Sequence, residues 1–381
     1  MSNIQIRPVQ TAREVRQFLT FPWRIYHNDP LWVPPLLPER RKQIDPKRGA
    51  FFKRGEAEFF IAWRDKKPVG AICVAEDKGT NAQRHTNDCM FGFFEYIEDY
   101  LVAETLLDYV REWGKRRGLS TLYGPFNLDY KDGFGVLIEG RDRPPALLCG
   151  HTPPYYKDFM ERYGFHPARG QSLALEISNV LDTPVLDTPA MQRLFRIAER
   201  ARKHSRVTIR NADFKRWDEE VENIYLLFNA SLAHLPDFIP WQREAVEAIL
   251  ASFRNIADPE LIFFAEVEGK VVGFFPGIPN LNEVLIHVNG LRYPWDYLKL
   301  LWHMRRKPES LTIKSINILP EYWGTPVSIL LFTEMAKRAR EKGCKWADLS
   351  LTSDDNPNTP ILAERMGARV YKRYQVYRLP I

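Results

Sequence analysis

A proline and a glycine separate a predicted strand from a predicted helix in residues 315–343, SINILPEYWGTPVSILLFTEMAKRAREKG. The strand breaks at Pro320, and the helix follows Gly324. Backbone N–H groups at a helix N-terminus, with the partial positive charge of the helix dipole, can bind a phosphate group. Glycine at such a junction lets the backbone approach the phosphate without an intervening side chain. The stretch fits either a phosphate site or a turn retained for packing.

The first half of the chain has a corresponding strand-to-helix junction in GFFEYIEDYLVAE, residues 92–104. No glycine stands at this junction, and Glu98 and Asp99 occupy the start of the helix. These acids can cap the helix dipole themselves and would repel a phosphate. We therefore predict that the N-terminal half binds no pyrophosphate and instead has a structural or substrate-positioning role.

The composition is that of a globular protein with a sizeable core. Apolar residues make up 45% of the 381 residues and charged residues 27%, and the length suggests two domains. The formal net charge of +6 could attract an anionic ligand but does not indicate nucleic-acid binding. We expect no nucleic-acid partner.

The four cysteines and the N-terminus indicate the compartment. Cys73, Cys89, Cys149 and Cys344 are far apart and lack the spacing of metal ligands, which predicts free thiols in a reducing environment and no metal site. The N-terminus has no apolar signal core, and no apolar run approaches the roughly 20 residues of a membrane span. The sequence predicts a cytoplasmic protein without a membrane-spanning segment.

The order strand, strand, strand–helix–strand–helix–strand is written twice. Each half has a hairpin with apolar alternation, EFFIAWRDKKPVGAICVAED and ELIFFAEVEGKVVGFFPGI. Each then has an amphipathic helix that ends in a basic turn and a glycine, Gly118 or Gly343. We predict an N-terminal domain over residues 1–180, a linker with a connecting helix over 181–204, and a C-terminal domain over 205–381.

This duplicated plan resembles the GCN5-related N-acetyltransferase (GNAT) fold, present twice and covering most of the chain. PEYWGTPVSILL resembles the acyl-CoA motif of that family, and DDNPNTPILAERMGA resembles its later asparagine-and-helix motif. DPLWVPPL, GPFN and YKRYQVYR are similar to stretches of tandem-domain bacterial acetyltransferase-like proteins. The resemblance implies a mixed α/β (α+β) fold. Each domain would have a mostly antiparallel sheet with a splayed strand pair and flanking helices.

The resemblance also implies acetyl-CoA or another acyl-CoA as co-substrate of the C-terminal half. Four backbone amides would hold the pyrophosphate, those of Trp323, Gly324, Thr325 and Val327. Residues 316–319, including Ile318 and Leu319, would splay from the neighbouring strand and pair with the pantetheine amides. Asn356 matches the asparagine of the later motif, which commonly contacts the cofactor.

Two residues depart from the acyl-CoA motif. Glu321 stands where the family usually has glutamine or arginine, and Pro326 stands where it has glycine or alanine. Proline has no N–H group, so one donor is lost. A charge-assisted hydrogen bond contributes about 1.5–3 kcal/mol, so its loss would weaken binding by roughly tenfold or more.

Acyl transfer to an amine needs a neutral amine, a donor to the carbonyl oxygen and a proton for the leaving thiolate. The family's tyrosine acid falls at Ala363 here and cannot be carried over. We predict three catalytic candidates: Asn317, which could hold a water, Tyr374 on the closing strand, and His234 in the region that lines the acceptor side. In the N-terminal half we predict a substrate-binding cluster beside the splay, formed by Glu95, Asn127, His151 and Tyr155. A hydrogen-bonded loop network is the alternative for that cluster.

The resulting prediction is an N-acyltransferase that moves an acetyl or other acyl group from acyl-CoA to a small-molecule amine. A FemX-like transferase with an aminoacyl-tRNA donor is one alternative, because two such folds and a basic charge are compatible with it. A non-catalytic protein that binds an acyl chain or another small molecule is the other, since the motif is imperfect in one half and absent in the other.

Overall fold

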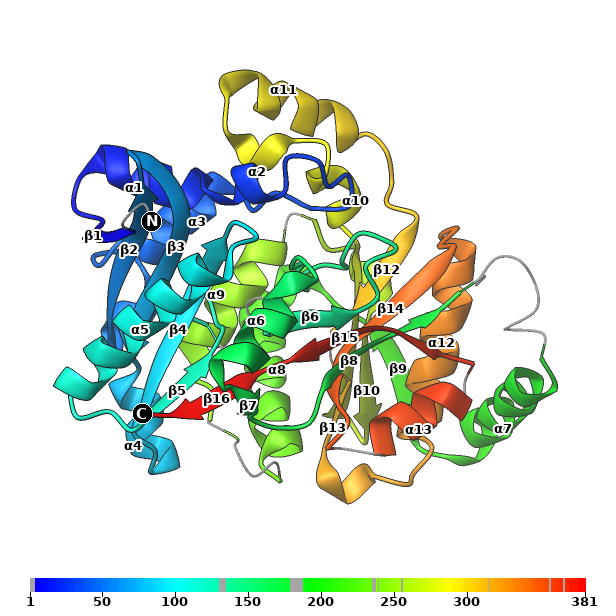
Figure 1. Cartoon of the computed structure of the whole chain (residues 1–381). Helices are drawn as coiled ribbons and strands as arrows, with labels where there is room; N and C mark the ends of the chain where they lie inside the picture. Colours follow the sequence, from blue (N-terminus) through cyan, green and yellow to red (C-terminus); the bar gives the residue numbers. More distant parts are fainter. Residues whose placement is uncertain are drawn as a thin grey trace.

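Two mixed sheets form the framework of the protein (Figure 1). The computed structural model describes residues 4–129, 135–178, 188–234, 238, 240–254, 256–314, 316–355, 358–365 and 367–381. The first sheet has the order β1 (Gln5–Pro8), β2 (Glu56–Arg64), β3 (Lys67–Glu76), β4 (Asp88–Tyr96), β5 (Thr121–Gly124), β16 (Tyr377–Pro380) and β7 (His166–Pro167). The second has the order β6 (Val136–Glu139), β15 (Arg369–Gln375), β8 (Ser172–Ile177), β14 (Trp346–Ser353), β12 (Ser310–Ile313), β11 (Lys270–Pro279), β10 (Ile262–Val267) and β9 (Val207–Asn211), with β13 (Asn317–Ile318) paired to β11.

The two sheets exchange strands. Strand β8, from the first half of the chain, lies between β14 and β15 of the second sheet. Strand β16, at the end of the chain, lies between β5 and β7 of the first sheet. Figure 1 shows the red β16 among the strands of the N-terminal half. The predicted boundary at residues 181–204 stays a prediction, because residues 179–187 are outside the described part of the chain.

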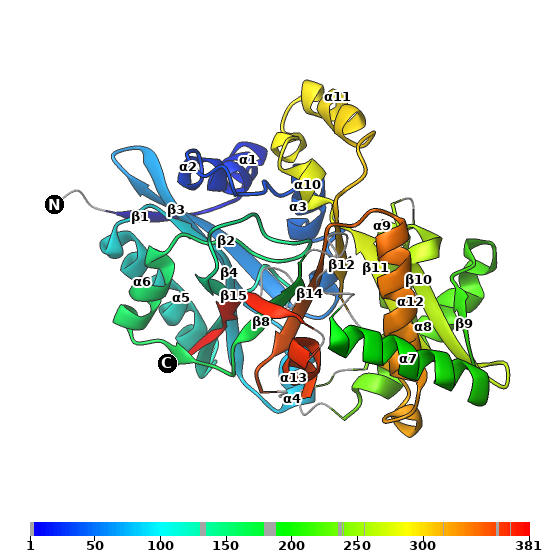
Figure 2. The same ribbon diagram turned by 90° about the vertical axis from the view of Figure 1, so that its right-hand side faces the viewer.

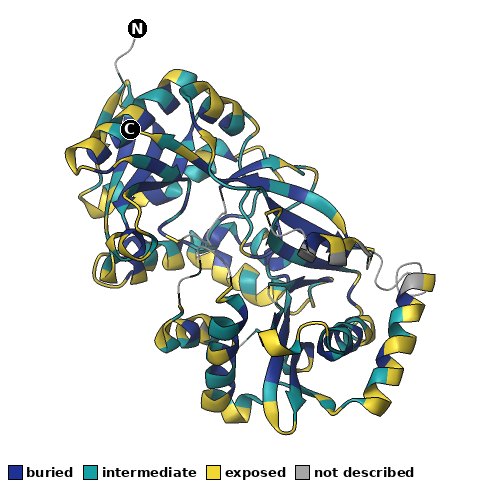
Figure 3. Ribbon diagram, turned by 90° about the horizontal axis from the view of Figure 1, so that it is seen from below, coloured by how far each residue is buried: buried dark blue, intermediate teal, exposed yellow. Residues whose placement is uncertain are grey.

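Helices cover both sheets. They are α1 (Ala12–Thr20), α2 (Pro22–Ile25), α3 (Leu37–Ile44), α4 (Lys78–Arg84), α5 (Tyr100–Arg116), α6 (Tyr155–Tyr163), α7 (Pro189–His204), α8 (Trp217–Leu232), α9 (Arg243–Phe253), α10 (Asn282–Leu285), α11 (Pro294–His303), α12 (Val327–Glu341) and α13 (Asn358–Arg365). Short 3-10 turns are η1 (Ala50–Lys53), η2 (Phe214–Arg216), η3 (Pro259–Leu261), η4 (Asn289–Leu291) and η5 (Pro320–Tyr322). Figure 3 shows the buried residues concentrated in the strands and on the inner faces of the helices.

The helices α5 and α12 occupy equivalent places in the two halves, as the repeat predicts. Each packs against its sheet through a stripe of buried apolar residues, Val102, Leu106, Val110 and Trp113 in α5 and Val327, Leu331, Met335 and Ala339 in α12. Gly118 (φ +71°) and Gly343 (φ +80°) follow the two helices in the left-handed conformation that glycine adopts readily. Helix α7 packs on α12, as Figure 2 shows.

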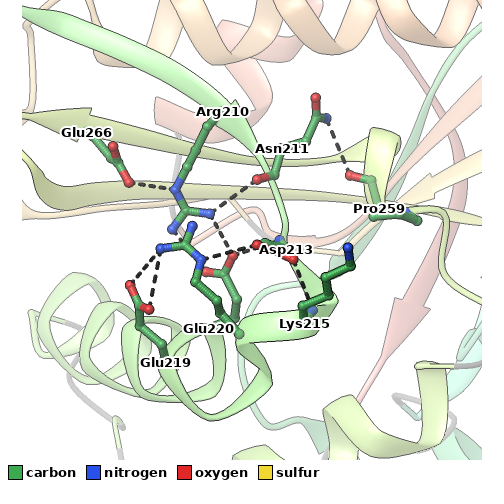
Figure 4. A network of polar contacts seen from close by, with 9 residues as sticks. Arg210, Asn211, Asp213, Lys215, Glu219, Glu220, Pro259 and Glu266 are labelled. Carbon is green, nitrogen blue, oxygen red and sulfur yellow. Dashed lines mark hydrogen bonds and ion pairs between the residues drawn. The ribbon is translucent and has the colours of Figure 1, made fainter.

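A partly buried ion-pair network fixes β9 to α8 (Figure 4). The Arg210 guanidinium donates to Glu220 at 2.6 and 3.0 Å and to Glu266 at 2.5 Å. Glu220 also accepts a hydrogen bond of 2.8 Å from the Asp213 backbone N–H. The network therefore joins two strands and the start of α8, and it contributes to the fold and not to a cavity.

The segment that carries α10, η4 and α11 leaves the second sheet and contacts the N-terminal half. The Trp23 indole Nε1 donates to Asn289 Oδ1 at 2.6 Å. Gly290 (φ +65°) approaches so closely that an added Cβ would lie 2.4 Å from Pro35 O. Within the described part of the chain, no helix has both the length and the apolar character that crossing a membrane requires.

Candidate functional site

The predicted splay is present in the second sheet. Strands β12 and β14 pair in parallel as far as Thr312 and Asp348. Beyond this point the chain turns away, and β13 pairs with β11, with Asn317 opposite Phe274 and Ile318 opposite Gly273. A gap therefore opens between β13 and the end of β14. Residues on both of its sides, including Ile318 and Ser350, line a cavity.

The N-terminus of α12 presents unpaired amides to this gap. Among the described residues, the N–H groups of Gly324, Ser328 and Ile329 have no hydrogen-bond partner. Gly324 has φ +75°, and an added Cβ would meet no atom within 4 Å. Gly324 and Ser328 both line the cavity. This corner has the donors and the open space that a pyrophosphate requires.

The other predicted amides donate within the chain. Trp323 N–H donates to Pro320 O at 3.1 Å and Thr325 N–H to Tyr322 O at 3.2 Å. Val327 N–H lies 3.4 Å from Thr325 Oγ1. The sequence predicted four amides at this site. Gly324 alone of these is unpaired among the described residues, and the free amides of Ser328 and Ile329 were not predicted.

The Trp323 indole lies across part of the gap. The Leu319 backbone N–H donates to Val272 O at 3.0 Å across the β11–β13 pair. The alternation of antiparallel hydrogen bonds therefore turns the polar groups of Ile318 away from β11 and into the gap. Trp323 Nε1 donates to Ile318 O at 3.0 Å, and the half-exposed indole packs edge-on against His234. A pantetheine chain that pairs with Ile318 must displace this indole.

One cavity of about 1870 Å³ runs from this junction into the N-terminal half. Its lining is mainly aliphatic and aromatic and includes Phe18, Leu19, Trp32, Phe93, Leu147, Phe228, Trp241, Phe275, Ile313, Ile316, Phe332 and Leu351. Polar side chains from the N-terminal half, including Glu95, Asn127 and His151, line the same cavity. Both halves of the duplicated fold therefore enclose one shared space.

Glu95 lies in this cavity with two tyrosines. The Tyr156 hydroxyl donates to Glu95 Oε2 at 2.7 Å, and the Tyr26 hydroxyl donates to the same oxygen at 3.2 Å. Burial raises the pKa of Glu95 to about 7, although both hydroxyl donors act in the opposite direction. Glu95 is half-buried and is one of the residues that line the cavity. A carboxyl group with this pKa changes charge readily near neutral pH.

His151 forms a dyad with Asp29, which the sequence did not reveal. His151 Nε2 lies 2.7 Å from Asp29 Oδ2. Because a carboxylate only accepts, this contact places the proton on Nε2 and leaves the lone pair on Nδ1. Nδ1 is buried and has no hydrogen-bond partner among the described residues. Burial lowers the pKa of His151, and Asp29 partly offsets this effect. The imidazole is therefore suited to accept a proton.

A third polar group lies at the mouth of the gap. Lys314 Nζ is 3.6 Å from Asp348 Oδ2 and 3.7 Å from Cys149 Sγ. Asp348 is fully buried and accepts a hydrogen bond of 2.8 Å from the Tyr371 hydroxyl and another from Ser350. Lys314, Cys149 and Ser350 line the cavity. A partly buried ammonium group therefore stands beside the splay.

The remaining predicted residues have other contacts. Asn317 is fully buried, and its Oδ1 accepts from Ser231 Oγ at 2.8 Å. The Tyr374 hydroxyl donates to Gly150 O at 3.0 Å, and burial raises its pKa well above the usual range. His234 lines the cavity, with Nδ1 2.9 Å from Ser231 O. Asn356 lies outside the described residues.

In the N-terminal half, Tyr155 is separate from the cavity, and Tyr156 lines it instead. The Tyr155 hydroxyl donates to Tyr96 O at 2.7 Å. Asn127 Oδ1 accepts from Phe93 N–H at 2.8 Å, at the position equivalent to the splay of the second half. A Cβ on Gly92 would lie 1.6 Å from Phe126 O. This junction is closed by close backbone packing, and Asp99 caps α5 by accepting from Leu101 N–H at 3.0 Å.

Comparisons with known proteins agree with this architecture. Residues 222–368 match the model of the acetyltransferase (GNAT) family. The chain is 28% identical over 386 residues to a bacterial ceramide synthase of Caulobacter vibrioides, with 99% of this chain and 97% of the relative covered.

Two solved structures share the fold. One is a tandem GNAT protein from the clavulanic acid biosynthesis pathway, with a TM-score of 0.57, 12% identity, and coverage of 99% of this chain and 98% of the other. The second is a GCN5-related N-acetyltransferase from Sphaerobacter thermophilus, with a TM-score of 0.54, 14% identity, and coverage of 99% and 95%. The chain as a whole thus has the fold of a tandem GNAT protein, and its residues 222–368 match the acetyltransferase (GNAT) family.

Proposed function

We propose that this protein is an acyl-CoA-dependent N-acyltransferase whose amine acceptor carries a long apolar chain, so that the product is an amide of the ceramide kind. The family of residues 222–368 and the relative named as a bacterial ceramide synthase support acyl transfer in general. The donor and the acceptor are our proposal. The observation that carries it is the single, largely apolar cavity that joins the splay to the polar cluster of the N-terminal half.

The acyl-CoA donor is assigned to the C-terminal half. The unpaired amides of Gly324, Ser328 and Ile329 would hold the pyrophosphate, and the gap beside Ile318 would take the pantetheine chain. The N-terminal half is a poor alternative because its own junction is closed at Gly92 and capped by Asp99.

The acceptor is assigned to the rest of the cavity. Its volume of about 1870 Å³ exceeds the roughly 300–1,000 Å³ of ordinary ligand pockets. Its aromatic and aliphatic walls suit hydrocarbon chains, which gain free energy on leaving water. The carboxyl group of Glu95, with its two tyrosines, would bind the polar end of the acceptor. A short, polar amine would leave most of these apolar walls uncovered.

The reaction needs one base. The amine nitrogen attacks the thioester carbonyl, the C–N bond forms, and the C–S bond breaks to release the CoA thiolate. His151 would accept the proton that the amine loses, through the Nδ1 lone pair, while Asp29 holds its tautomer. Lys314 would stabilise the negative charge on the carbonyl oxygen during attack. The CoA thiol is formed when its thiolate takes up a proton.

A direct assay tests the proposal. The purified protein is mixed with acetyl-CoA, decanoyl-CoA or palmitoyl-CoA and with sphinganine or ethanolamine, and the amide is measured by mass spectrometry. We expect amide formation with sphinganine and much less with ethanolamine. Equal rates with both amines would exclude the proposal that the acceptor is a lipid. Absence of any amide with every pair, despite binding of acyl-CoA, would leave only a binding role.

A matched pair of glycine variants tests the donor site. Gly324→Glu places a carboxylate in the open corner where the pyrophosphate would lie, so we expect the Kd for acyl-CoA to rise at least tenfold, with roughly 1.4 kcal/mol lost per factor of ten. Gly343→Glu has the same left-handed strain and open surroundings at the opposite end of α12, so it controls for stability. Titration calorimetry measures both. Equal affinities in the two variants would place the donor elsewhere.

A further inference from the structure

The solvent-facing side of α11 is unusually apolar. Residues 292–307, which include α11, are called the arm. Six of its large hydrophobic side chains are between 44% and 69% exposed, namely Trp295, Tyr297, Leu298, Leu301, Trp302 and Met304. Trp295, Leu298 and Trp302 follow one another at spacings of three and four, so they share a helix face. Monomeric globular proteins seldom expose so large a cluster without a partner that covers it.

The exposed charges of the same arm are all positive. Residues 292–307 contain five Lys and Arg residues and a single acid, Asp296. Asp296 is fully buried, where it accepts from Tyr293 N–H at 2.9 Å. Lys299, Arg305, Arg306 and Lys307 are exposed, and the Arg306 guanidinium lies 4.8 Å from the Trp302 ring centroid. The arm therefore presents cations and apolar side chains to solvent without an exposed acid.

The position of the arm also matters. Figures 1 and 2 show α11 projecting from the body of the protein, beyond α10 and the segment that carries α2. At its base, Leu281, Asn282 and Leu285 line the large cavity. The arm is held to the N-terminal half by the Trp23–Asn289 hydrogen bond, so the exposed face is presented on a fixed base.

We propose that α11 and its basic C-terminal end dock on the surface of a membrane that contains anionic lipids. A helix with Trp, Tyr and Leu on an exposed face and with flanking Lys and Arg residues lies in the interface plane, with its apolar side chains among the acyl chains. The 10 residues of α11 are half of the roughly 20 that spanning requires, so the helix lies on the bilayer. This inference does not depend on the proposed reaction.

Vesicle co-sedimentation of the full-length protein tests the docking. One set of vesicles contains phosphatidylcholine alone, and the other also contains phosphatidylglycerol. We expect binding to the anionic vesicles, weakened at least tenfold in Leu298→Glu/Trp302→Glu. The control, Leu226→Glu, changes a leucine on α8 that is 54% exposed and is expected to bind as the wild type does. A second variant, Arg305→Gln/Arg306→Gln/Lys307→Gln, is expected to lose about tenfold or more on the anionic vesicles.

Three results would overturn the inference. The first is that the wild type binds neither set of vesicles. The second is that the wild type and Leu298→Glu/Trp302→Glu bind equally well. The third is that light scattering shows a wild-type dimer, which this double variant converts to a monomer without any change in vesicle binding. The last result would assign the exposed face to a second copy of the chain. Because the substituted residues are exposed, an unchanged thermal midpoint is the expected sign that the variants are folded.

Discussion

At the scale of single residues, His151 and Asp29 are the pair that best fits proton transfer. They are 122 positions apart in the sequence, and only the folding of residues 21–38 over the cavity brings them within 2.7 Å. His151 was predicted as a substrate-binding residue of the N-terminal half, but Asp29 could not be found from sequence. Nothing in the stretch HNDPLWVPP separates an aspartate that contacts a histidine from one that starts a turn.

Replacement of His151 by Asn is expected to lower kcat by about 10²–10⁴-fold, because the proton of the amine then lacks its acceptor. The wild-type rate should fall as the pH decreases below the lowered pKa of His151, where the imidazole is protonated, and this decline should be absent from the variant. Single-turnover rates across pH measure both effects. His27→Asn, at an exposed histidine, is the control. An unchanged pH profile in His151→Asn would exclude it as the base.

Glu95 is expected to make the protein less stable as the pH rises. Its pKa in the folded protein is about 7, against an ordinary value of 4.5. The folded state therefore holds the proton more tightly than the unfolded chain does, and stability is lost as the pH rises from 4.5 to about 7. The difference between these two pKa values sets an upper limit of about 3 kcal/mol on the loss, and solvent that reaches the carboxyl group through the cavity lowers it.

Urea unfolding of Glu95→Gln and wild type at pH 4.5 and pH 8 measures this effect. The free energy of unfolding of the wild type should decrease relative to the variant as the pH rises. The exposed Glu98, replaced by glutamine, should give no such difference. If Glu95→Gln and wild type keep a constant difference across this range, the carboxyl group is not desolvated in the folded protein.

At the scale of elements, the strand–glycine–helix junction at Gly324 was recognisable because glycine, proline and helix periodicity are local signals. The conformation of Trp323 was not. A tryptophan beside a glycine in a loop gives no indication that its indole will donate to Ile318 O. The same limit applies to Lys314 and Asp348, which are in contact where β12 and β14 begin to separate. It also applies to Asn127, whose side-chain Oδ1 accepts a hydrogen bond from Phe93 N–H at a closed junction.

Removal of the Trp323 indole is expected to strengthen acyl-CoA binding by a few-fold, because the Ile318 carbonyl no longer has to exchange one donor for another. Titration calorimetry on Trp323→Ala gives the Kd. Trp295→Ala, at another half-exposed tryptophan, serves as the reference. Weaker binding in Trp323→Ala would mean that the indole contacts the cofactor and does not compete with it.

At the scale of the whole molecule, the family resemblance predicted two mostly antiparallel sheets, each with a splayed strand pair. The structure confirms two mixed sheets and a splay in the second sheet, whereas the equivalent junction of the first sheet is closed at Gly92. The exchange of β8 and β16 could not be predicted. An alternating strand carries information about which face is buried, but little about which of two similar edges it joins. The stretches SLALEIS and RVYKRYQVYRL predict closing strands of their own halves. In the structure β8 lies within the second sheet, and the second stretch divides into β15, which stays in the second sheet, and β16, which lies within the first.

This exchange predicts one cooperative unfolding transition. Tyr377 of β16 is fully buried in the core of the N-terminal half, and truncation of a large buried aromatic costs about 3–5 kcal/mol. In Tyr377→Ala we expect the lowered stability to appear with probes of either half, measured by calorimetry and by tryptophan fluorescence. Two separate transitions, with only one of them displaced, would show that the halves unfold independently.

The interleaved sheets also limit how the two halves of this protein can move relative to each other. Because β8 and β16 tie each half into the sheet of the other, the two walls of the shared cavity cannot swing apart about a hinge. The bulky hydrophobic product of the proposed reaction would therefore leave through rearrangement of small parts, such as the indole at Trp323 or the proline-rich segment over residues 32–36. For the proposed reaction we therefore expect departure of the product, and not bond formation, to be the slow step.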